Sequence, residues 1–507
     1  MKYMKKLMAL LAALTLALAM AVPAFAEAAA TTTYTITIKN GTGTYAAYQI
    51  FKGDLHEGTL SNIQWGDNVT DAGQAEFGDA AVKAKTLTGE TEAKAFAVEV
   101  APYLGGTAST VTVDSNGTGT ITGLAAGYYL IKNTTVGKDE VYTDYILRVV
   151  ENVSVTPKSD KPTLDKQIKH NETGAWGVVG DNQIGDTVEF RTITTVPDVS
   201  GYSKYEYVIH DEMSAELTSN VKTKDDVTIK VNDTTELENT YYTVTVDTAN
   251  ANKFTVTIDV LKAIQDGKMA AENELYTYYT GILNENAAVY DVGKQNNKAY
   301  LEYSNNPHDK DSKTETPKKV VYDWTFKMEV NKVDGADNKD LSGAKFVLSK
   351  TNGLDLGAID DDGKPAKTEN LINLIQNSDG SYTVAPADYT GTYVMTAGKI
   401  TIKGLDDATE YYLYETKAPA GYNRLTDAVK FKITADYDGT GENCTSVTTK
   451  VNEDDPKASL SITVKNNKGA SLPSTGGIGT TLFYVIGGGL MAVAAVLLVA
   501  KKRMNNK

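Results

Sequence analysis

Apolar and polar residues alternate in short runs along most of the chain. Residues 34–39 read Tyr-Thr-Ile-Thr-Ile-Lys, and comparable runs recur as far as residue 464. A period of two places every second side chain on the same face, which is the pattern of a half-buried β-strand. The other predicted strands cover residues 110–113, 145–155, 187–194, 241–246, 253–260, 298–303, 325–330, 399–402, 429–433 and 460–464.

Turn signals separate these predicted strands. Asn-Gly or Asp-Gly pairs lie at residues 116–117, 266–267, 352–353, 379–380 and 438–439. Such pairs favour tight turns between strands. Helical periodicity is confined to residues 80–103, 259–265 and 369–376. We therefore predict an all-β fold built from tandem immunoglobulin-like β-sandwich domains.

The N-terminal end has the pattern of a secretory signal peptide. Three lysines lie within the first six residues, an apolar run covers residues 7–22, and Ala24-Phe25-Ala26 follows. A charged start, an apolar stretch and a small-x-small site are the parts that signal peptidase recognises. We predict a signal peptide at residues 1–26 with cleavage after Ala26, and a membrane anchor helix is the weaker alternative because the run is short.

The C-terminal end combines a short motif with a membrane-spanning pattern. An apolar segment covers residues 480–500, long enough to cross a bilayer, and a basic tail at residues 501–507 is expected to stay in the cytoplasm. The motif just before it is Leu472, Pro473, Ser474, Thr475 and Gly476. The arrangement resembles the LPxTG sorting signal of Gram-positive surface proteins. That resemblance implies sortase cleavage between Thr475 and Gly476, and the alternative is a permanently membrane-spanning protein.

Length and linker composition predict three domains in the body. A chain of 507 residues is long enough for about three domains of ordinary size. Proline- and lysine-rich stretches at residues 156–162 and 306–319 have the composition of domain joints. They divide the body into a first domain at 27–157, a middle domain at 158–320 and a third domain at 321–468.

Charge and residue counts exclude several classes of function. The chain has 65 acidic and 50 basic residues and a formal net charge of −15, so we expect no nucleic-acid partner. One cysteine, Cys444, excludes an internal disulfide framework and a multi-cysteine metal site. The acidic run at residues 360–363 lacks the later ligands of a calcium loop and is interpreted as a solvated turn. We expect no cofactor and no bound metal.

The third predicted domain contains a motif that points to a family. Residues 411–422 read Tyr-Tyr-Leu-Tyr-Glu-Thr-Lys-Ala-Pro-Ala-Gly-Tyr, with the glutamate at Glu415. This segment resembles the E-box, YxLxETxAPxGY, of the collagen-adhesin B-type (CnaB) domains of Gram-positive pilins. Together with the sorting signal, it makes the whole chain resemble a SpaA-type major (backbone) pilin.

The resemblance implies a self-made amide crosslink in the third domain. Lys332 on the first strand would be the nucleophile, Asn466 on the last strand the acceptor and Glu415 the catalyst, with Asn467 as the alternative acceptor. The residue types suit this chemistry, because burial lowers the pKa of a lysine and a protonated carboxylic acid can activate an amide. The reaction happens only once at each site, without turnover, so we do not expect an enzyme.

The same resemblance assigns roles in the other two domains. In the middle domain, Lys166, Asp211 and Asn305 would be nucleophile, catalyst and acceptor, with Asn306 as the alternative acceptor. In the first domain, residues 123–132 echo residues 404–415, but Lys132 stands where Glu415 stands. We therefore expect no crosslink within residues 27–157.

A further lysine lies at the joint after the first domain. Residues 153–159 read Val-Ser-Val-Thr-Pro-Lys-Ser and resemble the pilin motif VxVYPKN, which makes Lys158 the lysine that joins subunits and Lys161 the alternative. The resemblance implies a shaft subunit of a sortase-assembled pilus, polymerised through Thr475 and Lys158. Its implied partners are a class C pilin sortase, the housekeeping sortase, other copies of itself, minor pilins, peptidoglycan and host extracellular-matrix or epithelial ligands. The alternatives are a monomeric cell-wall-anchored adhesin with a CnaB stalk and, less well supported, a surface enzyme.

Overall fold

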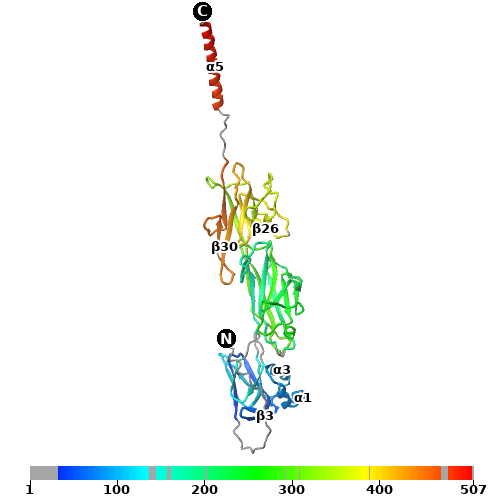
Figure 1. Ribbon diagram of the computed structural model, residues 1–507. Coiled ribbons are helices and arrows are strands. Elements are labelled where there is room, and N and C mark those ends of the chain that lie inside the picture. The colour runs from blue at the N-terminus through cyan, green and yellow to red at the C-terminus, as the bar shows by residue number, and fades with distance from the viewer. Residues whose placement is uncertain are drawn as a thin grey trace, which may run out of the picture.

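Three β domains follow one another end to end, and a long helix stands beyond the third (Figure 1). The structure is a computed structural model that describes residues 32–135, 144–156, 161–199, 202–290, 292–307, 309–387, 389–469 and 478–504. Strands dominate each domain, so the predicted all-β fold is confirmed. The predicted signal peptide, Lys158 and the motif at residues 472–476 lie outside the described residues.

The first domain packs a small sheet and a larger sheet against each other and carries helices on the outside of the larger one. The small sheet has the order β5-β1-β8, and the larger has the order β3-β2-β6-β7 with β4 also paired to β2. The strands are β1 Tyr34–Ile38, β2 Thr44–His56, β3 Thr59–Trp65, β4 Ser109–Thr112, β5 Gly119–Leu124, β6 Gly127–Asn133, β7 Asp144–Val149 and β8 Val153–Val155. The helices are α1 Asp71–Phe77, α2 Ala80–Thr86, α3 Glu90–Val100 and the 3₁₀ turn η1 Ala101–Tyr103.

The middle domain is a sandwich of two large sheets that are antiparallel except for the parallel pair β11 and β22. One has the order β10-β9-β12-β19-β15-β16 with β14 on β19, and the other has the order β11-β22-β20-β13-β18-β17 with β21 on β20. The elements of the first are β9 Leu164–Lys169, β10 Trp176–Gly177, β12 Thr187–Thr195, β14 Leu217–Ser219, β15 Thr228–Val231, β16 Thr235–Glu236 and β19 Glu274–Leu283. Those of the second are β11 Val179–Asp181, β13 Tyr207–Met213, β17 Tyr242–Val246, β18 Lys253–Ile258, β20 Gln295–Ser304, β21 Lys313–Glu315 and β22 Lys319–Trp324. The helical turns are η2 Lys224–Asp226 and α4 Val260–Gln265.

The third domain is a smaller sandwich of two five-stranded sheets. Their orders are β25-β26-β28-β23-β32 and β27-β24-β29-β30-β31. The first and last strands, β23 and β32, are parallel neighbours in the first of these sheets. The strands are β23 Phe326–Asp334, β24 Ala344–Ser349, β25 Leu374–Gln376, β26 Tyr382–Val384, β27 Met395–Ala397, β28 Lys399–Leu405, β29 Glu410–Lys417, β30 Val429–Tyr437, β31 Cys444–Val451 and β32 Ser461–Asn466.

Several predicted elements have different bounds in the structure. The predicted strand at 145–155 is two strands, β7 and β8, because the chain crosses from one sheet to the other at residues 150–152. The predicted helix at 80–103 is divided into α2, α3 and η1. The predicted helix at 369–376 is wrong: Asn370 has a φ of 68°, which no helix interior accepts, and Leu374 pairs with Val384 in a sheet.

The second predicted joint is also not a joint. Residues 313–315 form β21, which pairs with β20, and β22 at residues 319–324 pairs with both β20 and β11. The stretch at 306–319 is therefore a loop and an edge strand inside the middle domain. The sheet of that domain continues to Trp324, past the predicted boundary at residue 320.

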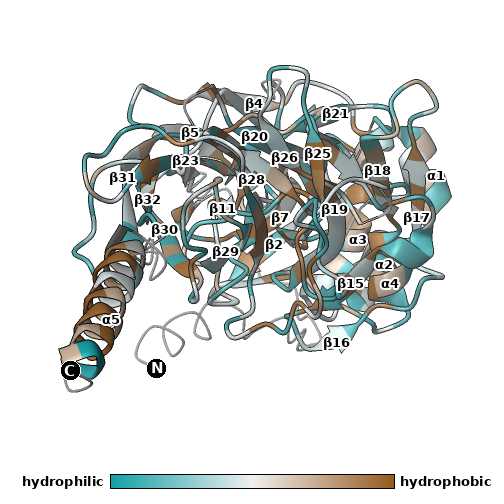
Figure 2. Cartoon of the chain, turned by 90° about the horizontal axis from the view of Figure 1, so that it is seen from above, coloured by the Kyte–Doolittle hydropathy of each residue, from teal (hydrophilic) through white to brown (hydrophobic). Residues whose placement is uncertain are grey.

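The C-terminal helix has the length and composition of a membrane span. Helix α5 covers Ile478–Met504, and its segment Leu482–Met504 has a mean hydropathy of 2.5 in its most apolar window. Apolar residues cover the helix on all sides, and large side chains such as Phe483 and Tyr484 are exposed (Figure 2). Basic residues Lys501, Lys502 and Arg503 lie in its last turn, as a span with a cytoplasmic tail requires.

Candidate functional site

Three polar side chains meet in the buried interior of the third domain. Lys332 on β23 and Asn466 on β32 come from neighbouring parallel strands, with Lys332 opposite Val464 and Asp334 opposite Asn466. Glu415 comes from β29 in the facing sheet. Lys332, Glu415 and Asn466 are 1%, 4% and 0% exposed. Alternation along each strand turns these residues toward the core, in line with Val330 and Val464.

Glu415 lies between the lysine and the asparagine. Its Oε1 is 3.7 Å from Lys332 Nζ, and its Oε2 accepts a hydrogen bond of 2.8 Å from Asn466 Nδ2. Lys332 Nζ also donates to the main-chain oxygen of Val464 at 3.2 Å, which holds the amine beside β32. One carboxyl group therefore contacts both the amine and the nitrogen of the amide.

The segment after Glu415 closes over this group. Leu425 N donates to Glu415 Oε2 at 2.8 Å, and Asn466 Nδ2 donates to the Asn423 oxygen at 2.5 Å. Tyr422 donates its hydroxyl proton to Asp334 Oδ2 at 2.8 Å, which ties the end of the E-box segment to β23. The Pro-Ala-Gly turn of the motif thus brings residues 422–425 back over the buried acid.

Burial sets the charge state of the lysine. Desolvation lowers the pKa of Lys332, and the neighbouring Glu415 carboxyl opposes that shift in part. Glu415 Oε1 and Asn466 Oδ1 are buried without a hydrogen-bond donor. Burial thus biases the amine toward its neutral form, and the Asn466 amide oxygen on the neighbouring strand has no donor. Asn467, the alternative acceptor, is exposed, so the geometry favours Asn466.

The middle domain contains a second buried group of the same kind. Lys166 on β9 places Nζ 2.6 Å from Oδ2 of Asp211, which lies on β13 in the facing sheet. The hydroxyl of Tyr279 on β19 lies in hydrogen-bond contact with both. Burial lowers the pKa of Lys166 and raises the pKa of Asp211, so desolvation favours the neutral form of each partner.

The structure does not bring Asn305 to this group, so the predicted acceptor of the middle domain is corrected. Asp211 pairs with Ala299 on β20, and Asn305 follows six residues later. At a rise of about 3.3 Å per residue, that places Asn305 about 20 Å along the strand. Asn305 Oδ1 instead accepts a hydrogen bond from Ser312 at 2.7 Å. Asn306, the alternative, is one residue further away.

Asn297, which the sequence analysis did not single out, is the asparagine that lies beside this group. It lies on β20 opposite Met213, two residues from Asp211 on the same inward face. It is fully buried, neither of its side-chain polar atoms has an aligned partner, and its amide contributes to lowering the pKa values of both Asp211 and Tyr279. The only sign of Asn297 in the sequence was its spacing. Like Asn305, it lies an even number of positions from Tyr303 and is therefore expected on the same face of the strand.

The first domain has aliphatic residues where the third has its lysine. Its first and last strands, β1 and β8, are also parallel neighbours, with Ile36 opposite Val153 and Ile38 opposite Val155. Ile36 and Ile38 are fully buried, and the described part of this domain contains no buried lysine. Lys132 lies on β6 and is partly exposed. The absence of a crosslink in this domain stays a prediction.

Of the two candidate lysines at the first joint, the structure describes Lys161 but not Lys158. Lys158 lies outside the described residues, three positions after the end of β8. Lys161 is exposed and lies just before β9. The joint therefore begins next to the strand pair that closes the first domain.

Comparisons with known proteins identify two matching segments and several similar proteins. Residues 326–449 match the SpaA family, described as a prealbumin-like fold domain, and residues 464–507 match the Gram-positive LPXTG cell wall anchor motif. The chain is similar to fimbrial subunit type 1 of Actinomyces viscosus, at 24% identity over 380 residues, covering 69% of this chain and 66% of that protein. It is also similar to the trypsin-resistant surface T6 protein of Streptococcus pyogenes, at 28% identity over 266 residues, covering 44% of this chain and 48% of that protein.

Similar solved structures include other pilins. The T6 backbone pilin of Streptococcus pyogenes has 16% identity and a TM-score of 0.47, covering 86% of this chain and 99% of that one. The major pilin SpaD of Corynebacterium diphtheriae has 19% identity and a TM-score of 0.45, covering 86% and 98%. The chain spans about two thirds and about half of the length of the two sequence relatives. The third domain therefore matches the SpaA family, the C-terminal end carries an LPXTG cell wall anchor motif, and the chain as a whole is similar to Gram-positive pilins.

Proposed function

We propose that the protein is the shaft subunit of a sortase-assembled pilus, strengthened inside each subunit by lysine–asparagine amide bonds. The observation that supports this most strongly is the pair of buried lysine–acid–asparagine groups, one in the middle domain and one in the third. Two buried lysines with acid partners are costly in a core unless they serve a purpose. An LPXTG anchor directly after the third domain supplies the signal for covalent attachment.

The proposed chemistry in the third domain is a single amide exchange. Lys332 Nζ, as the neutral amine, attacks the side-chain carbonyl carbon of Asn466 while Glu415 holds the amide. The new C–N bond forms, the bond from that carbon to Nδ2 breaks, and the nitrogen leaves as ammonia. Glu415 contacts both nitrogens, so it can take the proton from the amine and deliver it to the departing one. The folded core holds the amine and the amide together, so the reaction does not depend on a bimolecular encounter.

The middle domain would use the same chemistry with Lys166, Asp211 and Asn297. Asp211 replaces the glutamate, and its Oδ1 has no hydrogen-bond partner, so this oxygen is available to activate the amide of Asn297. Tyr279 contacts both the amine and the acid and would orient them. The raised pKa of Asp211 favours the protonated acid that such activation needs.

Assembly would join Thr475 of one subunit to Lys158 of the next. A pilin sortase of class C would cleave between Thr475 and Gly476 and transfer the threonine carbonyl to that lysine, and the housekeeping sortase would attach the finished polymer to peptidoglycan. Helix α5 would hold each subunit in the membrane until cleavage. Minor pilins and host extracellular-matrix or epithelial ligands are further proposed partners.

A lysine replacement tests the shaft function. Cell-wall extracts boiled in detergent should contain a ladder of covalent polymers, which Lys158→Arg should abolish because arginine stays protonated and cannot attack. Lys161→Arg is the matched control and should leave the ladder intact. A single wall-linked band in the unmutated strain would instead identify a monomeric adhesin.

A further inference from the structure

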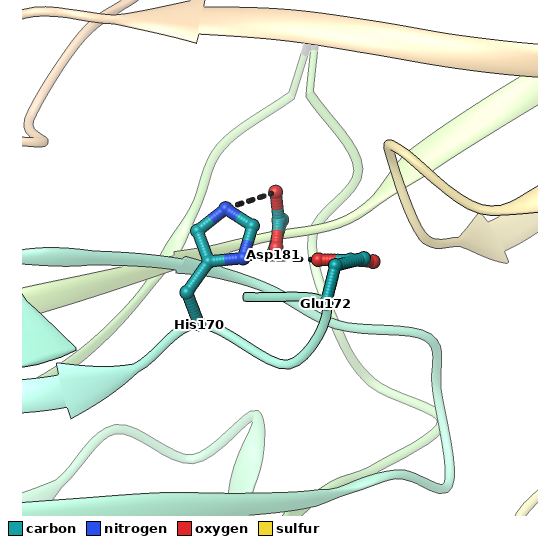
Figure 3. Close-up of side chains that lie close together, drawn as sticks. All are labelled: His170, Glu172 and Asp181. Carbon is teal, nitrogen blue, oxygen red and sulfur yellow. Dashed lines mark ion pairs between the residues drawn. The ribbon is translucent and has the colours of Figure 1, made fainter. Parts of the chain in front are cut away.

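Four carboxylates gather at the contact between the middle and third domains. Glu172 and Asp181 belong to the middle domain, and Asp406 and Asp407 follow β28 in the third. One ligand oxygen from each of the four lies within 4.8 Å of the others. Figure 3 shows the side chains of His170, Glu172 and Asp181 converging on one point from two segments of the middle domain.

Three of the four carboxylates are buried, and each of these three has at least one oxygen without a hydrogen-bond donor. Asp181, Asp406 and Asp407 are 1%, 1% and 3% exposed. Both oxygens of Asp181 and the Oδ1 atoms of Asp406 and Asp407 are buried with no hydrogen-bond partner. Buried polar atoms in native proteins are nearly always paired, and buried charges are paired or coordinate a metal. Asp181 in particular has two buried oxygens without a hydrogen-bond donor, in a group with three other acids.

The protein groups around the cluster supply too little positive charge. His170 places Nδ1 3.0 Å from Glu172 Oε2 and Nε2 3.5 Å from Asp181 Oδ2. Lys350 acts on Asp406 through its charge, but its Nζ lies 4.0 Å from Asp186 Oδ2.

The remaining oxygens are held in fixed positions by donors. Asn171 Nδ2 and Thr409 Oγ1 donate to Asp406 Oδ2 at 2.8 and 3.0 Å. Ala435 N and Tyr437 Oη donate to Asp407 Oδ2 at 3.0 and 3.2 Å. Asp406 and Asp407 thus each have one oxygen held by two donors and one oxygen without a donor.

The two domains meet rigidly beside the cluster. Ile184 N donates to the Gly404 oxygen at 3.1 Å, and Trp324 Nε1 donates to the Gly441 oxygen at 3.0 Å. A Cβ atom at Gly404 would lie 2.5 Å from the side chain of Ile184, so Ile184 packs directly against the Gly404 backbone. Such contacts hold the four carboxylates in position in the absence of a ligand, and a specific cation site needs this preorganisation.

We propose that Glu172, Asp181, Asp406 and Asp407 bind one divalent cation of the calcium type, which joins the middle and third domains. The ligands are all carboxylate oxygens, the donor set that hard cations such as Ca²⁺ prefer. The cation neutralises acids from both domains, so its binding resists their separation. This site shares no residue with the crosslinking groups, and it departs from the expectation of no metal that the sequence alone gave.

Calcium titration of the full chain tests the proposal. The protein is produced in a host without sortase, purified in detergent and stripped with EDTA, and Ca²⁺ is then added in a calorimeter. We expect one site per chain and a rise in melting temperature of roughly 5–10 °C at a hundredfold excess over Kd. Mg²⁺ should bind more weakly because it demands stricter octahedral geometry.

Matched variants decide where calcium binds. Asp181→Asn and Asp406→Asn preserve shape and should weaken Ca²⁺ binding at least tenfold, while their melting temperatures without calcium should not fall because repulsion is relieved. Asp361→Asn, in the exposed acidic turn, is the control and should bind as the unmutated protein does. An unmutated protein without calcium-dependent heat or melting shift would overturn the proposal. Calcium binding by Asp181→Asn as tight as that of the unmutated protein would also overturn it. So would a protein that does not bind calcium but binds zinc, and loses the zinc in His170→Gln.

Discussion

Lys166 and Asp211 lie 2.6 Å apart, Nζ to Oδ2, although β9 and β13 belong to the two facing sheets of the middle domain. Lys332 and Glu415 have the equivalent relationship in the third domain, with β23 and β29 in facing sheets and 3.7 Å between the charged atoms. Each lysine crosses the core of its sandwich to reach an acid. The two domains therefore share the same arrangement, a buried lysine facing an acid on the opposite sheet, with aspartate in one and glutamate in the other.

Intact mass measures the proposed crosslinks directly. Each lysine–asparagine amide releases one ammonia, about 17 Da. The secreted body, residues 27–475, should therefore be about 34 Da lighter than its sequence mass. Glu415→Ala and Asp211→Ala should each restore about 17 Da, because each removes the acid of one group. An unmutated protein at its full sequence mass would refute the crosslinks.

A pair of asparagine variants tests the corrected acceptor of the middle domain. Asn297→Ala should leave one ammonia unreleased, because Asn297 lies beside Asp211 on β20. Asn305→Ala is the control and should keep the full mass deficit, because Asn305 lies about 20 Å away along the strand. Mass spectra of both variants give the answer, and the opposite result would return the acceptor role to Asn305.

Thermal unfolding should reveal the stability that a crosslink contributes. Lys332 and Asn466 are 134 positions apart, and closing a loop of that size is worth ~4–5 kcal/mol in the chain-entropy treatment of disulfides. Glu415→Ala should therefore lower the melting temperature of the third domain by roughly 10–20 °C in calorimetry. Glu410→Ala, on the same strand, removes an acid that is 50% exposed beside Lys430. It should change stability by less than about 0.5 kcal/mol, and equal shifts in the two variants would argue against a crosslink.

Mechanical pulling tests why the bonds join first and last strands. In a fibre linked through Lys158 and Thr475, tension enters the third domain at β23 and leaves at β32, which are parallel neighbours. A Lys332–Asn466 bond would carry that load covalently. Single molecules pulled between positions 158 and 475 should show no unfolding step of full domain length, and Glu415→Ala should add one such step. A full-length extension of the unmutated third domain would remove the mechanical role.

The sequence predicted those parts of the site that local patterns specify. Glu415 lies in a continuous motif, and Lys332 and Asn466 lie on alternating strands next to recognisable landmarks, so the structure places all three where the resemblance implied. Asn297 lies in mid-strand with no motif around it. Its proximity to Asp211 depends on the register between β13 and β20, which the sequence does not display.

Other features depended on contacts that only the folded chain creates. The carboxylates of Glu172, Asp181, Asp406 and Asp407 come from separated segments of two domains, so no spacing rule could unite them. The apolar run at residues 369–376 looked helical, but its residues pack as an irregular segment and the short strand β25. Short apolar runs are ambiguous between helix and strand without their partners.

The linkage between subunits is the most direct test of the account. High-mass polymers from the cell wall can be digested with trypsin and their branched peptides sequenced by mass spectrometry. The account predicts a branched peptide in which the carbonyl of Thr475 is joined to the ε-amine of Lys158. Polymers in which Thr475 is joined to a different lysine, or a wall fraction in which Thr475 is joined only to peptidoglycan, would contradict it.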